Sequence, residues 1–193
     1  DRDRGVITIV VQEVGKTTME LSRHEPGDEI LDLLGPCGTG IEIKYFGRIA
    51  CVCGGLGAAP VYPKAKALYE AGNDIIMFVG AQTATRLILT EELAAVSSEM
   101  YYATDDGSYG HHCFVSDSLR PYLATGKKID KVIAVGPVPM MKSVCDLTKE
   151  FNVATTVSLN AIMIDGTGMC GGCRVTVNGE TKFSCIAGPS FDG

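Results

Sequence analysis

Short apolar runs alternate with helical periods from Arg48 to Ser158, and this alternation limits most strongly what the chain can fold into. The apolar runs predict strands at 48–53, 74–79, 99–104, 131–135 and 154–158. The stretches between them have the period of amphipathic helices and predict helices at 59–71, 84–96, 116–124 and 138–151. Strands that alternate with helices form a parallel sheet with helices on both faces. The expected fold class is therefore α/β, with a Rossmann-like domain over residues 46–158.

The first 45 residues have a different pattern. Polar and apolar residues alternate from Val6 to Val14, a turn follows at Gly15 to Thr18, and a second strand-like run extends from Glu29 to Leu34. Alternation with period 2 predicts half-buried strands. Because the alternation begins directly after DRDRG, without an initiator Met, we expect upstream sequence to be missing and this stretch to begin partway through a sheet.

The loop after the first strand of the parallel sheet is rich in glycine, with the sequence CGGLGAAP from Cys53 to Pro60. Glycines at such a position let the backbone approach a pyrophosphate, and Pro60 suits the first position of a helix whose amide end attracts anions. A tight turn without a ligand is the alternative, and the motif alone leaves the two open.

Three further strand ends carry residues suited to a ligand, and they are Gly80, the pair Asp105 and Asp106, and the pair Gly136 and Pro137. Ligands bind at the carboxyl ends of the strands in open parallel sheets. A carboxylate near the adenosine ribose suits a free 2′-hydroxyl and repels a 2′-phosphate, so the two aspartates favour NAD over NADP. The alternative is that they only cap a turn.

Near the C-terminal end, Asp165, Cys170, Cys173 and Cys185 have the spacing D-x4-C-x2-C-x11-C within a glycine-rich loop, DGTGMCGGC. Plant-type iron–sulfur ligands have the pattern C-x4-C-x2-C and then a distant cysteine, and here an aspartate stands where the first cysteine would be. Gly166, Gly168, Gly171 and Gly172 are able to adopt the positive φ angles that a loop wrapped around a cluster needs. Zinc binding and ordinary buried thiols are the two alternatives.

A β-hairpin is predicted around Asn178 and Gly179, because alternating residues flank this pair and a type I′ turn needs positive φ at both positions. The cysteine ligands would then lie on both sides of the hairpin. We place a small iron–sulfur arm at residues 159–193.

Composition narrows the possible partners of the 193-residue chain. Its net charge of -6 and pI near 5.1 give no clustered basic surface for nucleic acid or an anionic membrane. No apolar run reaches the ~20 residues of a membrane span. Eight cysteines in a long, hydrophobic chain fit thiols and metal ligation better than disulfides, so we expect a cytoplasmic protein.

The motifs GKTT, CVCGGLGAAP, GAQT, TDDGSYG, VGPVPMM and DGTGMCGGC together resemble the ferredoxin-NADP reductase superfamily with a C-terminal two-iron two-sulfur (2Fe-2S) arm. Within it, the chain is similar to the small subunits of NADH-dependent reduced ferredoxin:NADP oxidoreductases, often called sulfide dehydrogenases. The electron-transfer subunits of dihydroorotate dehydrogenase are the next most similar. The latter have cysteine at the position of Asp165.

The resemblance implies a role for several residues. Residues 1–45 would be the C-terminal part of an FAD-binding β-barrel, in which Val10, Val11 and Gln12 lie along the flavin and Thr17 and Thr18 bind its phosphates. The nucleotide would be held by the matching residues of the parallel-sheet domain, which are Gly55, Gly57, Ala58, Pro60, Gly136 and Pro137. Asp165, Cys170, Cys173 and Cys185 match the cluster ligands.

The resemblance also implies a function. FAD would take electrons from NADH, and the 2Fe-2S cluster would pass them singly to a larger flavin and iron–sulfur subunit, in electron bifurcation that involves NADP and ferredoxin. No side chain is assigned as catalytic. The alternatives are the electron-transfer subunit of dihydroorotate dehydrogenase or of a hydrogenase, and a non-enzymatic dinucleotide-binding module held together by zinc. Met140 and Met141 are expected to pack in the core.

Overall fold

A computed structural model describes residues 4–193 and divides the chain into two compact units, residues 1–34 and Gly35–Gly193. The second unit is built on a seven-stranded sheet with the order β4-β3-β2-β1-β5-β6-β9. Its strands are β1 (Arg48–Gly54), β2 (Asp74–Ala81), β3 (Glu99–Thr104), β4 (His111–His112), β5 (Lys131–Val135), β6 (Thr155–Ser158) and β9 (Ser190–Asp192). Neighbouring strands are parallel except for β9, which runs antiparallel to β6.

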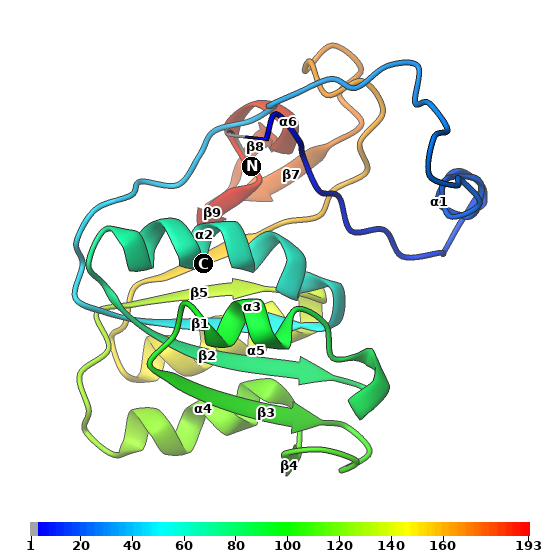
Figure 1. The fold of residues 1–193 in the computed structure, drawn as a ribbon. Helices are drawn as coiled ribbons and strands as arrows, with labels where there is room; N and C mark the ends of the chain where they lie inside the picture. The colour runs from blue at the N-terminus through cyan, green and yellow to red at the C-terminus, as the bar shows by residue number, and fades with distance from the viewer. Residues whose placement is uncertain (1–3) are drawn as a thin grey trace. The chain divides into compact units, whose positions relative to one another are not determined.

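Helices cover both faces of this sheet (Figure 1). On one face lie α2 (Ala58–Glu70) and the short α3 (Thr90–Ala94), and on the other lie α4 (Val115–Ala124) and α5 (Val138–Glu150). The sheet residues between the two layers are buried on both sides, so the strands are continuous apolar runs, as expected for a parallel sheet. The predicted α/β class and the parallel sheet are therefore confirmed.

The core on the α4 and α5 face contains an aromatic cluster. Phe78 stacks on Tyr101 with ring centroids 4.9 Å apart, and Tyr122 meets both rings edge-on at 5.6 Å. Tyr122 comes from α4 and the other two rings come from β2 and β3, so the cluster joins this helix to the sheet. Edge-on and offset-stacked pairs of this kind contribute about 0.5–1.5 kcal/mol each beyond the area they bury.

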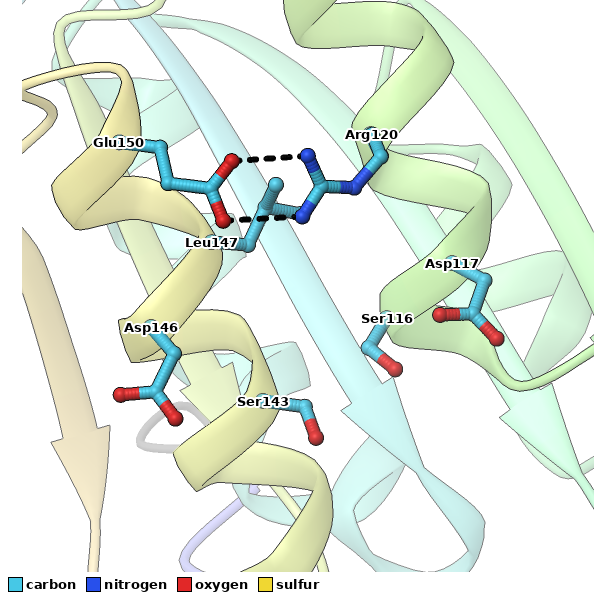
Figure 2. Close-up of a pocket in the computed structure, with 7 residues that line it drawn as sticks. All are labelled: Ser116, Asp117, Arg120, Ser143, Asp146, Leu147 and Glu150. Atoms are coloured by element: carbon cyan, nitrogen blue, oxygen red, sulfur yellow. Dashed lines mark hydrogen bonds and ion pairs between the residues drawn. The ribbon is translucent and has the colours of Figure 1, made fainter.

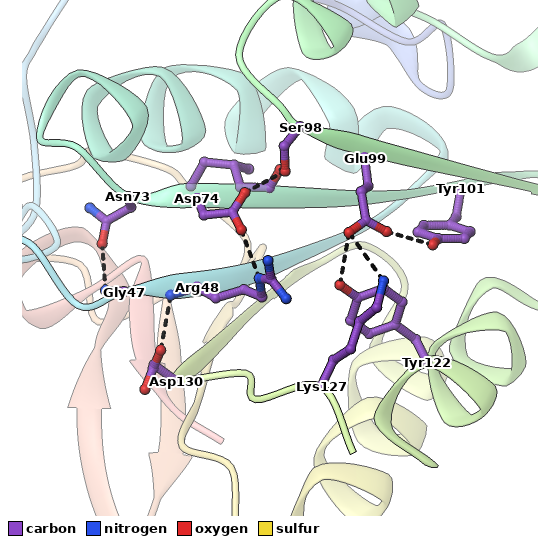
Figure 3. Close-up of polar contacts among 11 residues, drawn as sticks. Gly47, Arg48, Asn73, Asp74, Ser98, Glu99, Tyr101, Tyr122, Lys127 and Asp130 are labelled. Carbon is purple, nitrogen blue, oxygen red and sulfur yellow. Dashed lines mark hydrogen bonds and ion pairs between the residues drawn. The ribbon is translucent and has the colours of Figure 1, made fainter. Parts of the chain in front are cut away.

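A polar network fixes the edge of the sheet where the parallel strands begin (Figure 3). The Arg48 guanidinium donates to Asp74 at 2.7 Å, and the Arg48 amide donates to Asp130 at 2.9 Å. Glu99 accepts hydrogen bonds from Tyr101 at 2.7 Å and from Tyr122 at 3.2 Å. These side chains lie at the opposite edge from the predicted nucleotide site and serve the structure of the domain.

One predicted helix is interrupted. Residues 84–96 form a 3-10 turn, η2 (Ala84–Arg86), and then α3, with an extended segment between them. Leu87, Ile88 and Leu89 pack against the core on the α2 face, and Leu89 takes a left-handed φ of 54°. One helix face cannot bring three consecutive apolar side chains into partial burial against the same core, so the helix breaks there.

The arm after β6 contains the predicted hairpin. β7 (Arg174–Val177) pairs antiparallel with β8 (Glu180–Phe183), and Asn178 and Gly179 have φ of 52° and 79°, as a type I′ turn requires. A single helical turn, α6 (Ser184–Ala187), follows the hairpin. The chain then returns to the sheet as β9, which was not predicted because three residues after Gly-Pro carry no periodic signal.

In the first unit, the described residues 4–34 contain one helix, α1 (Lys16–Leu21), and no strand. The two strands predicted at 6–14 and 29–34 are therefore wrong for this chain. A strand needs a hydrogen-bonded neighbour, and residues 4–34 pair with none, so apolar side chains such as Ile7 and Leu31 are 67% and 94% exposed. That residues 1–45 belong to a β-barrel stays a prediction.

No helix within residues 4–193 has the length and apolar character that crossing a membrane requires.

Candidate functional site

The order of the strands reverses between β1 and β5, where the chain builds the sheet outward in two directions. The predicted glycine loop follows β1 as the 3-10 turn η1 (Gly55–Gly57), and Gly136 with Pro137 follows β5. Both loops therefore meet at one point on the carboxyl edge of the sheet. In open α/β sheets this point of reversal is the place where ligands bind.

Glycine lets the two loops pack against each other. A Cβ atom on Gly57 would lie 2.1 Å from the Val135 carbonyl oxygen, and one on Gly136 would lie 3.1 Å from the Gly54 amide nitrogen. Gly55 has a φ of 54° and only open space where its Cβ would be. Gly57 thus closes the floor of the site, and Gly55 leaves the backbone accessible to a ligand.

The helix after this loop begins earlier than predicted. α2 starts at Ala58, so Pro60 is its third residue and not its first. The first four amides of a helix have no partner within it, so proline is tolerated throughout the first turn. Ala58 is buried at the amide end of α2, next to the glycine loop.

Gly80 lies within β2, where Val115 of α4 packs over it. A Cβ on Gly80 would lie 2.6 Å from the Cβ of Val115, so glycine is needed there for contact between helix and sheet. The predicted contact of Gly80 with a nucleotide stays a prediction.

The loops after β2 and β3 are joined by Ser108, which the sequence did not single out. Its hydroxyl accepts the Ala84 amide at 2.8 Å and donates to Asp106 at 2.6 Å, while its amide also donates to Asp106. These bonds lower the pKa of Asp106. Asp106 therefore caps the turn, whereas the exposed carboxylate of Asp105 has no hydrogen bond to any residue in the range 4–193.

Met140 was expected in the core, but it has a second contact. Its sulfur lies 2.7 Å from the Cβ position of Gly54 and 3.0 Å from that of Gly136, so it packs beneath both loops. Met141 is buried, as expected. The sequence around Met140 contains no pattern that distinguishes packing in the core from packing beneath the two loops.

The cysteine-rich loop has the backbone that the glycine pattern predicts. Gly166, Gly168 and Gly171 have φ of 74°, 88° and 66°, whereas Gly172 does not have positive φ. Gly172 instead makes room for its neighbours, because its Cβ would lie 2.9 Å from Ile164. The turns bring the chain back on itself between Asp165 and Cys173.

Two of the four predicted ligands come together. The sulfur atoms of Cys173 and Cys185 share a hydrogen bond at 3.2 Å, and both side chains are buried. The Cys185 amide also donates to the Cys173 sulfur at 3.4 Å, which lowers the pKa of the Cys173 thiol. The contact joins the loop before the hairpin to the helical turn after it.

The other two predicted ligands lie apart from this pair. Cys170 is exposed, and Asp165 accepts the amides of Thr167 at 2.9 Å and Cys170 at 2.8 Å, which lowers the Asp165 pKa. Across residues 4–193 no three metal-ligating side chains converge. Two thiols and a carboxylate on the glycine-rich loop, together with the Cys185 thiol on α6, still suit iron, because thiolate is the usual ligand of iron–sulfur clusters.

The residues predicted to bind FAD lie in the first unit. Val10, Val11 and Gln12 are in an exposed segment without regular secondary structure, and Thr17 and Thr18 are in the first turn of α1. The Thr18 hydroxyl accepts the amides of Val14 and Gly15 at 3.1 Å each, so it caps this helix. Their flavin contacts stay a prediction.

Two cavities lie away from this edge of the sheet. One, of about 230 Å³, lies between α4 and α5, and the bidentate ion pair of Arg120 with Glu150 spans it (Figure 2). The other, of about 330 Å³, lies beside Arg48 and Asp74 in the structural network described above. Neither is lined by a predicted site residue.

The fold and the site together define a nucleotide-binding oxidoreductase module with an iron–sulfur arm. Residues 51–146 match the family described as "Oxidoreductase NAD-binding domain". Residues 160–193 match "Iron-sulfur cluster binding domain of dihydroorotate dehydrogenase B".

Similar proteins identify the family. The chain is 48% identical to the "Dihydroorotate dehydrogenase B (NAD(+)), electron transfer subunit homolog" of Thermotoga maritima, over 99% of this chain and 67% of that protein. It is 35% identical to the corresponding electron transfer subunit of Clostridium perfringens, over 97% of this chain and 74% of that one. The chain belongs to the family of dihydroorotate dehydrogenase B electron-transfer subunits and their homologues.

Solved structures agree with this assignment. A structure of NADH-dependent reduced ferredoxin-NADP oxidoreductase, described in connection with flavin-based electron bifurcation, superposes with a TM-score of 0.86 at 46% identity. The match covers 94% of this chain and 65% of that one. The C-terminal domain of a Pyrococcus furiosus hydrogenase has a TM-score of 0.53 at 28% identity, over 64% of this chain and 100% of that domain. The predicted family resemblance is confirmed.

Proposed function

We propose that this chain oxidises NADH with the help of FAD and passes single electrons through a 2Fe-2S cluster to a larger flavin and iron–sulfur subunit, in electron bifurcation between NAD, NADP and ferredoxin. FAD supplies the step from a two-electron donor to one-electron transfer. The chain itself contributes a nucleotide loop around Gly55 and an arm that presents Cys170, Cys173 and Cys185.

One observation carries this proposal. The arm ends in β9, which is hydrogen-bonded to β6 in the same sheet whose carboxyl edge holds the nucleotide loops. An electron donor and a cluster bound at these places would therefore be held by one framework. A separate redox module joined by a flexible linker would not need such pairing.

Asp165 favours the bifurcating type, because the family resemblance implies cysteine at this position in the dihydroorotate dehydrogenase type. Family membership alone supports the second as an alternative. A zinc-stapled module is the remaining candidate, since two thiols already meet in the arm.

Anaerobic purification with metal, sulfide and flavin analysis tests the proposal. The protein should be brown, contain iron and acid-labile sulfide in equal amounts, and bind FAD. Cys173→Ala should lose most of the iron and sulfide, whereas Cys113→Ser, which alters a thiol outside the arm, should keep them. A colourless zinc protein, or full iron and sulfide in Cys173→Ala, would contradict the proposal.

A further inference from the structure

One lysine ammonium connects a helix, the central sheet and the arm. Lys64 lies in the second turn of α2, and its Nζ atom donates to the hydroxyls of Ser158 and Ser190, the latter at 2.9 Å. The two serine oxygens lie 3.0 Å apart. Ser158 is the last residue of β6, and Ser190 is the first residue of β9. The three groups thus form a closed polar triangle over the seam between sheet and arm.

This lysine is not held by charge pairing. Its side chain is half-buried, and no carboxylate within residues 4–193 lies at ion-pair distance from it, whereas Lys66 on the same helix pairs with Glu70 at 4.0 Å. Burial lowers the Lys64 pKa, so the surroundings of this side chain make its charged form less favourable than it is in water. The ammonium instead donates hydrogen bonds to two hydroxyls that belong to different strands.

The seam that Lys64 spans is short. Only three residue pairs join β6 and β9, and backbone bonds from Leu159 to Pro189 and from Gly193 to Thr155, both 2.9 Å long, flank them. Short edge strands have little pairing of their own, so side-chain contacts decide how firmly they dock. Cys185 is five residues before Ser190, so the thiol pair lies close to β9 along the chain.

We propose that Lys64 is a positioning residue, which holds the arm against the nucleotide-binding sheet through its bonds to Ser158 and Ser190. The inference rests on the proposed function in one respect, namely that the arm carries an electron carrier. The position of this carrier relative to the nucleotide edge would then depend on a helix outside the arm. Removal of the ammonium leaves the two serines bonded to each other, so the loss is confined to the link with α2.

Amide hydrogen exchange of the purified protein tests this role. In Lys64→Met, peptides with the Leu159 and Gly193 amides should exchange about tenfold faster than in the wild type, which is the scale of a lost hydrogen bond to a charged group. Ser190→Ala should have the same direction of effect and serves if Lys64→Met does not fold. Lys66→Met is the matched control, and the Asp130 amide, bonded to Arg48 at the far edge of the sheet, should not change in any variant.

A second readout separates positioning from general damage. On mixing with NADH, flavin reduction should stay within about twofold of the wild type in Lys64→Met, while cluster reduction should slow several-fold, because only the arm has moved. Unchanged exchange at Leu159 and Gly193, an equal effect in Lys66→Met, or equal slowing of both carriers would overturn the inference. A wild-type protein without flavin or cluster would instead refute the proposed function, and the exchange experiment would still decide the role of Lys64.

Discussion

Gly55 and Gly57 stand two residues apart in one loop, yet an added methyl group would meet different surroundings at each. At Gly57 it would collide with the Val135 carbonyl, so Gly57→Ala should destabilise the protein by roughly 1–3 kcal/mol and weaken NADH binding. At Gly55 only the left-handed φ opposes alanine, at a cost of about 1 kcal/mol. Urea unfolding and NADH titration of both variants test this. Equal stability of Gly57→Ala and wild type would contradict the packing described.

Asp165 has two possible roles, and substitution separates them. Asp165→Asn keeps an oxygen that accepts the loop amides but is a poor iron ligand, so we expect a labile cluster in this variant. Asp165→Cys should retain the cluster with a shifted reduction potential and EPR signal, because thiolate donates more electron density than carboxylate. Asp146→Asn, which changes an exposed aspartate on α5, is the control. If Asp165→Asn had the iron content and spectrum of the wild type, Asp165 would only cap the loop.

The conformation or role of a single residue was predictable where a short local motif specifies it. The positive φ angles at Gly166, Gly168 and Gly171 followed from the spacing of the motif. The role of Ser108, which ties two loops together, did not, because its partner Ala84 is 24 residues away and no short motif records the contact.

At the scale of elements, Tyr122 holds α4 to the sheet, and its ionisation should make the protein less stable at alkaline pH. Burial raises the Tyr122 pKa to about 12, from about 10 in an unfolded chain. The contribution to stability is therefore complete below about pH 10 and is lost as the pH rises through about 12. Urea midpoints should fall less between about pH 9 and about pH 11.5 in Tyr122→Phe than in the wild type. Tyr69→Phe, on the exposed side of α2, should behave like the wild type; if it matched Tyr122→Phe, the assignment would fail.

The strands of the parallel sheet were predictable because each is a buried apolar run, and 99–104 and 131–135 agree residue for residue. The helix predicted at 84–96 was not predictable in this way, because the sequence does not reveal that Leu87 to Leu89 all pack, partly buried, against the core. β9 was not predictable because its position depends on pairing with the edge of β6, which is more than 30 residues away in the sequence.

At the scale of the whole molecule, the acidic carboxyl edge should select the nucleotide. We expect a higher kcat/KM for NADH than for NADPH, by about tenfold or more, in reduction of an artificial electron acceptor. Asp105 and Asp106 are both exposed carboxylates, and Ser108 holds Asp106 in place. Asp105→Asn removes one of the two charges without breaking the bonds of this turn, so it should lower the preference for NADH over NADPH more than Asp117→Asn. Equal or better turnover of the wild type with NADPH would refute this prediction.

The first unit shows where sequence patterns stop being sufficient. Its alternating residues do predict strands, but a strand exists only with a neighbour to pair with, and residues 4–34 supply none. The division into a barrel part at 1–45, a nucleotide domain at 46–158 and an arm at 159–193 stays a prediction.

The antiparallel seam between β6 and β9 has a consequence for grafting. Phe191 is buried with the core of the parallel sheet, and the Gly193 amide is bonded to β6, so the arm folds as part of its host. A cysteine loop transplanted without that edge would lose its anchor, and a sheet deprived of β9 would expose the rim of β6. An exchange of redox centres between such proteins would have to replace residues 160–185, with their hairpin, and leave the final strand in place.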